Sequence, residues 1–459
     1  MSRAGIVLLF LWPGVAGAAQ REAEFWTFGV NLSQSFTDNL FLLGLDGPGE
    51  AITNASLRLS YARLDGSSSL NASGWLGARR FDRFSFYGGP QFGLSALSRF
   101  GFGPRARLRL GGHLADGLNS GALGSGQIAL PQTQVQSGSV TAGFTYRLAP
   151  DTSADASFDA TGIRYRADRA FDTSRVLGDA FVPAEQLSSA PSSGLGANEP
   201  APDDGLLSLS LLASEGLQTL RLDFGTWRAG AGISHEFSPR TRLALGGGYR
   251  QTYQNPHTFS QGDQFEGQIA LREVIGSTAN LSLSYGFQES RFGVSLRTHS
   301  FTAQADKELG TKIRLDASLG ASRLDGPDRA SSNWTLLGGA GFSARFKRSI
   351  LSARYTRSRY QGLIVGRSQV TDVAYASLSH TISRRVSVSG FGYYRDARDE
   401  LQRRYSYDTT MAGASLSVRI KRRTSAGASY NFLRFHTRNE PAAHRSMVTL
   451  HVSYSRALK

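Results

Sequence analysis

Hydrophobic and polar residues alternate with a period of two along almost the whole chain after Arg21, and this pattern limits the fold more than any other feature. In the first such segment, Trp26, Phe28 and Val30 fall on one parity, while Thr27 and Asn31 fall on the other. The same alternation recurs in residues 137–148, 280–287, 333–346 and 446–454. Successive side chains of a strand point to opposite faces, so each segment predicts a strand with one apolar and one polar face. The sequence therefore predicts an all-β fold.

The connections between these segments alternate between short and long. Short turn sequences occur at 65–67, 149–151, 238–240, 309–311, 347–349 and 421–423. Longer polar connections occur at 37–51, 81–89, 115–133, 166–216, 254–262, 324–331, 361–367, 395–404 and 436–444. This rhythm is typical of outer-membrane barrels, which have short periplasmic turns and longer extracellular loops. It predicts a transmembrane antiparallel β-barrel of about 20 strands, within a range of about 18 to 22, with both ends on the periplasmic side.

Two features separate a membrane barrel from a soluble β-sandwich or propeller, the rival architectures. The apolar faces mix Leu with Ala, Gly and aromatic residues, whereas a soluble core favours Val, Ile and Leu. Aromatic residues also gather at segment ends, such as Phe144 and Tyr146 before one short turn and Tyr285, Tyr355 and Tyr394 before long connections. Such belts are expected at the two membrane interfaces. A helical membrane protein is excluded, because no apolar run approaches the roughly 20 residues needed to span a bilayer.

The N-terminal residues have the pattern of a secretory signal peptide. Arg3 precedes a short apolar stretch that ends at Pro13, and Ala16-Gly17-Ala18 forms a small-residue cleavage site. We expect residues 1–19 to be removed and residues 20–459 to form a single barrel domain integral to the outer membrane of a Gram-negative cell. The cysteine count is zero, which excludes disulfide scaffolds, thiolate zinc sites and cysteine nucleophiles.

The polar parity of the strands is expected to line the barrel interior, and it is rich in arginine. The chain carries 51 Lys+Arg against 36 Asp+Glu, a net charge of +15. A positive interior favours anions, although interior arginines that only pair with acids and fill space would set no selectivity. Nucleic-acid binding is disfavoured, because the basic residues are spread over alternating strands without stacking aromatic clusters. The candidate pore-lining residues are Arg58, Arg79, Arg107, Arg109, Arg147, Arg228, Arg242, Arg250, Arg272, Arg314, Arg345 and Arg354.

No local motif indicates catalysis, a metal site or a cofactor. The 8 histidines form no H-x-x-x-H pair, and no G-x-S-x-G motif is present. His257 and Ser260 lie close together in a polar connection, an arrangement that is common by chance. The Gly-rich segment 245–249 reads as a strand interior rather than a phosphate loop, because no helix follows it. We therefore expect no enzymatic activity, no metal and no cofactor.

The connection 166–216 has the composition of a surface loop, with Pro183, Pro191, Pro200 and Pro202. Loops of this length are often functional, so a lid over the pore and simple surface decoration are both open interpretations.

The first strand and its connection contain Phe36-Thr37-Asp38-Asn39-Leu40-Phe41. This run resembles a group of β-barrel porins of Gram-negative bacteria, some of which are associated with exopolysaccharide or capsule secretion. Asp38 and Asn39 suit a turn that leaves the strand, because their side-chain oxygens accept hydrogen bonds from backbone N–H groups. The C-terminus departs from the usual barrel pattern of a final Phe, since Tyr454 is followed by Ser-Arg-Ala-Leu-Lys.

Together these features predict a passive outer-membrane channel, a conduit for export of a polar or anionic polysaccharide. A general or anion-selective diffusion porin is the alternative, and a barrel enzyme or an adhesin acting through its extracellular loops is a third hypothesis. The expected partners are outer-membrane lipid, the barrel-assembly machinery and, as the resemblance implies, periplasmic polysaccharide-export components, but not nucleic acid.

Overall fold

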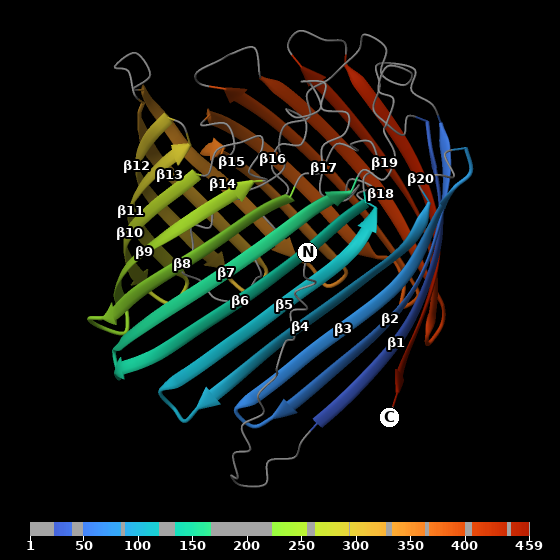
Figure 1. Ribbon diagram of the computed structural model, residues 1–459, viewed down its shortest axis with the longest axis horizontal. Coiled ribbons are helices and arrows are strands. Elements are labelled where there is room, and N and C mark those ends of the chain that lie inside the picture. The colour runs from blue at the N-terminus through green and yellow to red at the C-terminus, as the bar shows by residue number, and fades with distance from the viewer. Residues whose placement is uncertain are drawn as a thin grey trace, which may run out of the picture.

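The computed structural model is a closed antiparallel barrel of 20 strands (Figure 1). The structure describes residues 23–38, 49–83, 88–118, 134–166, 223–254, 262–292, 294–326, 333–362, 367–399, 406–437 and 442–458. The predicted signal peptide and most of the 166–216 connection lie outside these residues. The strands are β1 (Ala23–Thr37), β2 (Glu50–Asp65), β3 (Ser68–Phe81), β4 (Gly89–Phe102), β5 (Ala106–Leu118), β6 (Gln134–Ala149), β7 (Thr152–Arg166), β8 (Asp223–Glu236), β9 (Thr241–Gln254), β10 (Gly262–Ile275), β11 (Ala279–Phe292), β12 (Val294–Leu309), β13 (Ile313–Asp325), β14 (Asn333–Arg345), β15 (Ser349–Gly362), β16 (Arg367–Thr381), β17 (Val386–Asp399), β18 (Tyr407–Lys421), β19 (Thr424–Thr437) and β20 (Ala443–Leu458).

Each strand pairs with its neighbours in sequence, and β1 pairs with β20 to close the barrel. The predicted short turns all separate strands at one end, which we call the turn end, and β1 begins and β20 ends there. The opposite end is called the loop end. The predicted all-β fold and strand number are thus confirmed, and no helix in the described residues is long and apolar enough to cross a membrane.

One expected connection is wrong. Tyr285 was expected to precede a long connection, but β11 ends at Phe292 and β12 begins at Val294. The two strands pair up to Phe292 opposite Val294, so a single residue separates them. The local sequence carries no Pro and only Gly293 at the reversal, which is why the break was not visible in the alternation.

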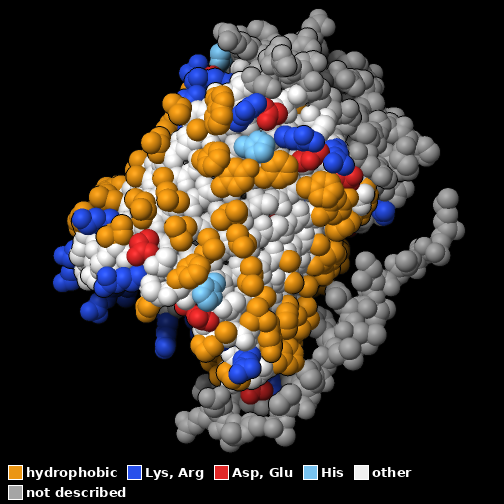
Figure 2. Space-filling view, turned by 90° about the vertical axis from the view of Figure 1, so that its left-hand side faces the viewer, with side chains coloured by type: hydrophobic (Ala, Val, Ile, Leu, Met, Phe, Trp, Pro, Cys, Tyr) orange, Lys and Arg blue, Asp and Glu red, His pale blue; other side chains and the backbone are white. Residues whose placement is uncertain are grey.

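The two faces of the sheet differ as the alternation predicts. Large exposed apolar side chains, such as Leu283, Phe301 and Leu336, share one parity, and the pairing register carries that parity from strand to strand. Figure 2 shows hydrophobic side chains spread over one side of the outer surface, with Lys and Arg mainly toward its edges. In a bilayer this outer face contacts the hydrocarbon, and closure of the barrel leaves no unpaired strand edge there. The opposite face, called the lumen face, carries the polar parity.

Exposed aromatic side chains form two groups on the outer face. Phe144, Tyr146 and Phe237 lie near the turn end, whereas Tyr355 lies at the middle of β15 and Tyr394 in the loop-end half of β17. The first group lies where a membrane-interface belt was expected, and the second lies further from the strand ends than the sequence predicted.

The closing seam between β1 and β20 is held by side chains as well as by the backbone ladder. The Ser446 N–H donates to Asp38 Oδ1 at 2.7 Å, just beyond the end of β1. Ser35 and Thr449 are joined by a hydroxyl hydrogen bond of 2.9 Å on the lumen face. Asp38 thus accepts a backbone hydrogen bond from the last strand, while the turn in which it was expected to act lies outside the described residues. The remainder of that motif, Asn39 to Phe41, lies outside the described residues.

The ladder between β14 and β15 is shorter than the strands themselves. It runs from Gly338–Arg357 to Arg345–Ile350, although both strands continue toward the loop end. Arg359 reaches across this open part of the seam. Its guanidinium donates to the Ser322 carbonyl oxygen at 2.8 Å and to Asn333 Oδ1 at 2.6 Å, and it also bonds the Thr335 hydroxyl. Arg359 has the outer-face parity of Arg357, whereas these partners have lumen-face parity, so its side chain ties three strands together where backbone bonds are missing.

We expect Arg359→Met to lower the free energy of unfolding by about 1.5–3 kcal/mol, because hydrogen bonds to a charged group are lost. Amide hydrogen exchange should accelerate in residues 333–337 and 358–361, measured by mass spectrometry in lipid or detergent. Arg323→Met is the control, since Arg323 is exposed and pairs with Asp325 of its own strand at 2.8 Å. Equal protection in the two variants would show that Arg359 does not hold the seam.

Candidate permeation path

All the arginines proposed from the sequence lie on the lumen face. The register places Arg58, Arg107 and Arg109 on the parity opposite to exposed Leu57, Leu110 and Leu114, and it continues this face around the barrel. The remaining candidates, from Arg79 on β3 to Arg354 on β15, lie on the same face. Their position inside the barrel is thus a property of the structure, while their role in permeation is taken up under Proposed function.

These arginines differ in exposure along the barrel axis. Those near the turn end are exposed: Arg107, Arg109, Arg147, Arg272, Arg314 and Arg345. Arg58 and Arg354 are exposed as well, whereas Arg79, Arg228, Arg242 and Arg250 are half-buried. Half-burial of Arg79 and Arg242 goes with hydrogen bonds to Asn54 at 2.6 Å and to Ser234 at 2.8 Å. The exposed arginines are therefore the ones available to a solute entering from the turn end.

Two lumen ion pairs reach across an intervening strand over a glycine. Arg354 of β15 donates to Asp316 Oδ2 of β13 at 3.2 Å, and Gly341 of β14 lies between them in register. In the same way Arg228 of β8 pairs with Glu266 of β10 across β9. The space that a Cβ at Gly341 would need is occupied by the Asp316 carboxylate, so glycine is what lets the acid lie over β14.

Gly341→Val should destabilise the barrel by about 1–3 kcal/mol, the usual cost of overpacking, and should separate Arg354 from Asp316. Thermal unfolding followed by loss of heat-modifiable migration in SDS gels measures the change. Gly143→Val is the matched control, because a Cβ there meets only the Arg109 Cβ at an ordinary 3.9 Å. A Gly341 variant as stable as the Gly143 variant would contradict this reading.

Several lumen arginines form no ion pair with a carboxylate of the described residues. Arg314 has a distant partner, Asp306, at 3.9 Å. The arginines without such a partner are Arg58, Arg79, Arg107, Arg109, Arg147, Arg242, Arg250, Arg272 and Arg345. The acidic side chains of the lumen face do not offset the positive charge of the lumen arginines. These acids are Glu50, Asp155, Asp159, Glu236, Glu266, Asp306, Glu308 and Asp316. A net positive potential inside the barrel follows, and it favours anions.

The lumen face is not polar throughout, although the polar parity of the strands was expected to line it. Near the loop end of β17–β20, Met411, Leu433 and Ala443 are buried together, with Phe391 and Tyr393 packed against them. Ala397, Tyr407 and Phe435 form a second buried group beside the first. We call both groups the lumen apolar patch. The sequence indicates this patch by a change of parity in β17. The apolar residues are even-numbered at Val386 and Val388 but odd-numbered at Phe391 and Tyr393.

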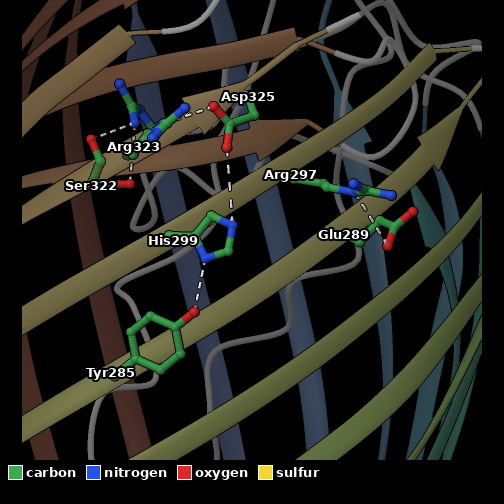
Figure 3. Close-up of polar contacts among 8 residues, drawn as sticks. Tyr285, Glu289, Arg297, His299, Ser322, Arg323 and Asp325 are labelled. Atoms are coloured by element: carbon green, nitrogen blue, oxygen red, sulfur yellow. Dashed lines mark hydrogen bonds and ion pairs between the residues drawn. The ribbon is translucent and has the colours of Figure 1, made fainter.

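The outer face near the loop end carries a belt of paired polar groups (Figure 3). Tyr285 and His299 Nδ1 share a hydrogen bond of 2.8 Å, and Asp325 lies 4.0 Å from His299 Nε2. Glu289 pairs with Arg291 at 3.0 Å and with Arg297 at 3.6 Å. Such pairing suits the level of the lipid headgroups, where charges stay hydrated. Ser322, the serine drawn nearby, accepts a hydrogen bond from Arg359 at 3.1 Å, whereas the contacts drawn for His299 are with Tyr285 and Asp325. The His257–Ser260 pair lies outside the described residues.

A resident metal has no candidate site in the part of the chain that the structure describes, since no three His, Asp or Glu side chains converge there.

No family model matches the chain, and no curated protein is similar enough in sequence to match it. Solved structures do match in fold. The FrpB iron transporter from Neisseria meningitidis (F5-1 variant) aligns with a TM-score of 0.53 and 10% identity, covering 94% of this chain and 82% of that one. A mutant of the ferric enterobactin receptor PfeA from Pseudomonas aeruginosa gives a TM-score of 0.51 and 8% identity, covering 94% and 80%. At so low a sequence identity, the similarity shows only a shared fold. The chain is therefore an integral outer-membrane β-barrel with an architecture that is also found in transport proteins.

Proposed function

We propose that this barrel is a passive aqueous channel that conducts anionic solutes across the outer membrane, with an anionic polysaccharide exported from the periplasm as its cargo. The observation that carries the proposal is the set of exposed lumen arginines without a carboxylate partner among the described residues. A barrel of about 20 strands encloses more space than its own side chains fill. Many separate cationic groups offer weak contacts, so an anion can enter and still leave.

Planar-bilayer recordings of the purified protein test the channel. We expect open-channel currents with a reversal potential that shows anion preference under a salt gradient, weakening as ionic strength rises. A barrel that inserts but does not conduct would overturn the proposal. For the cargo, deletion of the gene should reduce surface polysaccharide, and complementation should restore it. Normal surface polysaccharide in the deletion strain would leave a general anion-selective porin, the alternative from the sequence.

A second candidate function is uptake of a bulky ligand, and the lumen apolar patch favours it. The matched structures include FpvA of Pseudomonas aeruginosa bound to heterologous pyoverdines, with a TM-score of 0.50, 11% identity and coverage of 94% of this chain and 72% of that one. Phe391 and Tyr393 are only half-buried at the edge of this patch, so they give the lumen face aromatic contact area. Binding of ferric enterobactin to the purified protein, weakened by Tyr393→Ala, would support uptake. Absence of binding at micromolar chelate would contradict it.

A further inference from the structure

Basic residues crowd the turns along one half of the turn end. The hairpin turns between β12 and β19 carry Lys312, then Lys347-Arg348, then Arg384-Arg385, then Lys421-Arg422-Arg423 at the end of β18 and in the turn after it. These hairpins are neighbours in the barrel, so their turns follow one another around the rim. We call this set the basic arc.

The basic arc is not neutralised within the described residues. All its side chains are exposed, and none forms an ion pair with a described carboxylate. The turns themselves, residues 310–312, 346–348, 382–385 and 422–423, contain no Asp or Glu. The other half of the rim differs, because its turns carry only Arg105 and Arg240 as basic residues, and Asp151 opposes them. Among the turns, the positive charge is therefore concentrated on one half of the rim, although exposed lumen arginines such as Arg107 and Arg147 lie behind the turns of the other half.

The basic arc continues into the barrel. Arg314, Arg345 and Arg419 lie on the lumen face within a few residues of these turns and are exposed. Arg354 extends the same side further inward, although Asp316 partly offsets its charge. Lipid headgroups would meet only the outer side of the rim, whereas a track from rim to lumen fits a flexible polymer that passes from one to the other.

We propose that the basic arc is the capture site for a polyanionic chain, a carboxylated polysaccharide, that enters the barrel from its turn end; this inference rests on the proposed function and specifies where its cargo binds first. Concentrated charge at an opening raises the local concentration of an oppositely charged chain and speeds its arrival. The lumen arginines then provide the next contacts along the same side.

Binding of a fluorescein-labelled oligomannuronate to the detergent-solubilised protein, followed by anisotropy, tests the basic arc directly. We expect Arg384→Gln with Arg385→Gln to weaken binding by about tenfold, and addition of Lys347→Gln and Arg348→Gln to weaken it further. The matched control is Arg105→Gln with Arg240→Gln, which removes the same charge from turns on the other half of the rim and should change binding less than twofold. A neutral dextran of equal length should not bind. Equal weakening by the two double variants would overturn the proposal, as would wild-type protein that does not bind the oligomer.

The same oligomer added to either side of a planar bilayer separates this inference from the proposed function. Block of the current should be fast from the turn side and slower in the basic-arc variants. A conducting barrel with no oligomer binding would refute the basic arc and leave the channel intact. A barrel that binds the oligomer at the arc but never conducts would refute the channel and leave the binding site.

Discussion

Replacing Arg107, Arg109 and Arg147 by Glu is expected to convert the channel from anion-preferring to cation-preferring. These side chains lie on β5 and β6, face the lumen near the turn end, are exposed, and have no ion pair with a described carboxylate. Reversing their charge therefore changes the potential along the path itself rather than breaking a structural pair. The ratio of anion to cation permeability, obtained from the reversal potential in a salt gradient, should fall by a factor on the order of ten.

The controls for this experiment separate lumen charge from total charge. Arg80 and Arg434 are exposed on the outer face near the loop end, so Arg80→Glu with Arg434→Glu should leave the permeability ratio unchanged. Replacement of the three lumen arginines by Gln should give an intermediate ratio. An unchanged reversal potential in a folded triple-Glu barrel would remove these arginines from the permeation path.

Introducing Arg on the outer face and on the lumen face of β11 should affect stability very differently. Leu283 faces outward between the turn end of β11 and the charged Glu289 near its loop end, and it is 49% exposed, so in a bilayer it contacts hydrocarbon. Arg at a lipid-facing site near the midplane costs about 2–4 kcal/mol. The next residue, Ser284, faces the lumen, where Arg stays hydrated. We expect Leu283→Arg to reduce the free energy of unfolding by that amount and Ser284→Arg to change it by less than about 1 kcal/mol.

Reversible denaturation of the protein in lipid vesicles, followed by tryptophan fluorescence, measures both variants under the same conditions. The paired design holds the introduced residue and the depth nearly constant and changes only the face. Equal destabilisation by the two substitutions, or a larger effect at Ser284, would contradict the assignment of outer and lumen faces.

The strands and the faces were predictable because both depend on local chemistry. A residue such as Leu283 lies two positions from Leu281 and Tyr285, and a period of two places all three on one face whatever the neighbouring strands are. Turn residues such as Pro150 and Gly310 break the ladder locally, so the ends of most strands were predictable as well. The lumen location of the arginines followed from the same parity.

The contacts between strands were not predictable in this way. The pairing of Arg354 with Asp316 requires that β13, β14 and β15 adopt one register with Gly341 between them. The shortened ladder at β14 and β15, bridged by Arg359, depends on how the sheet curves there. The lumen apolar patch arises because β17–β20 bring Phe391, Leu433 and Ala443 together from separate strands.

Alternation along the chain alone was thus sufficient for an all-β barrel with an apolar exterior, an arginine-rich interior and about 20 strands. Closure of β1 on β20 through Asp38 and Ser446, the partners of each lumen arginine and the concentration of the basic arc on one half of the rim were decided by the tertiary structure. The physical reason is distance. Parity fixes the side to which a residue points from its own strand, but register, strand order and curvature fix which residues of distant segments come within bonding range.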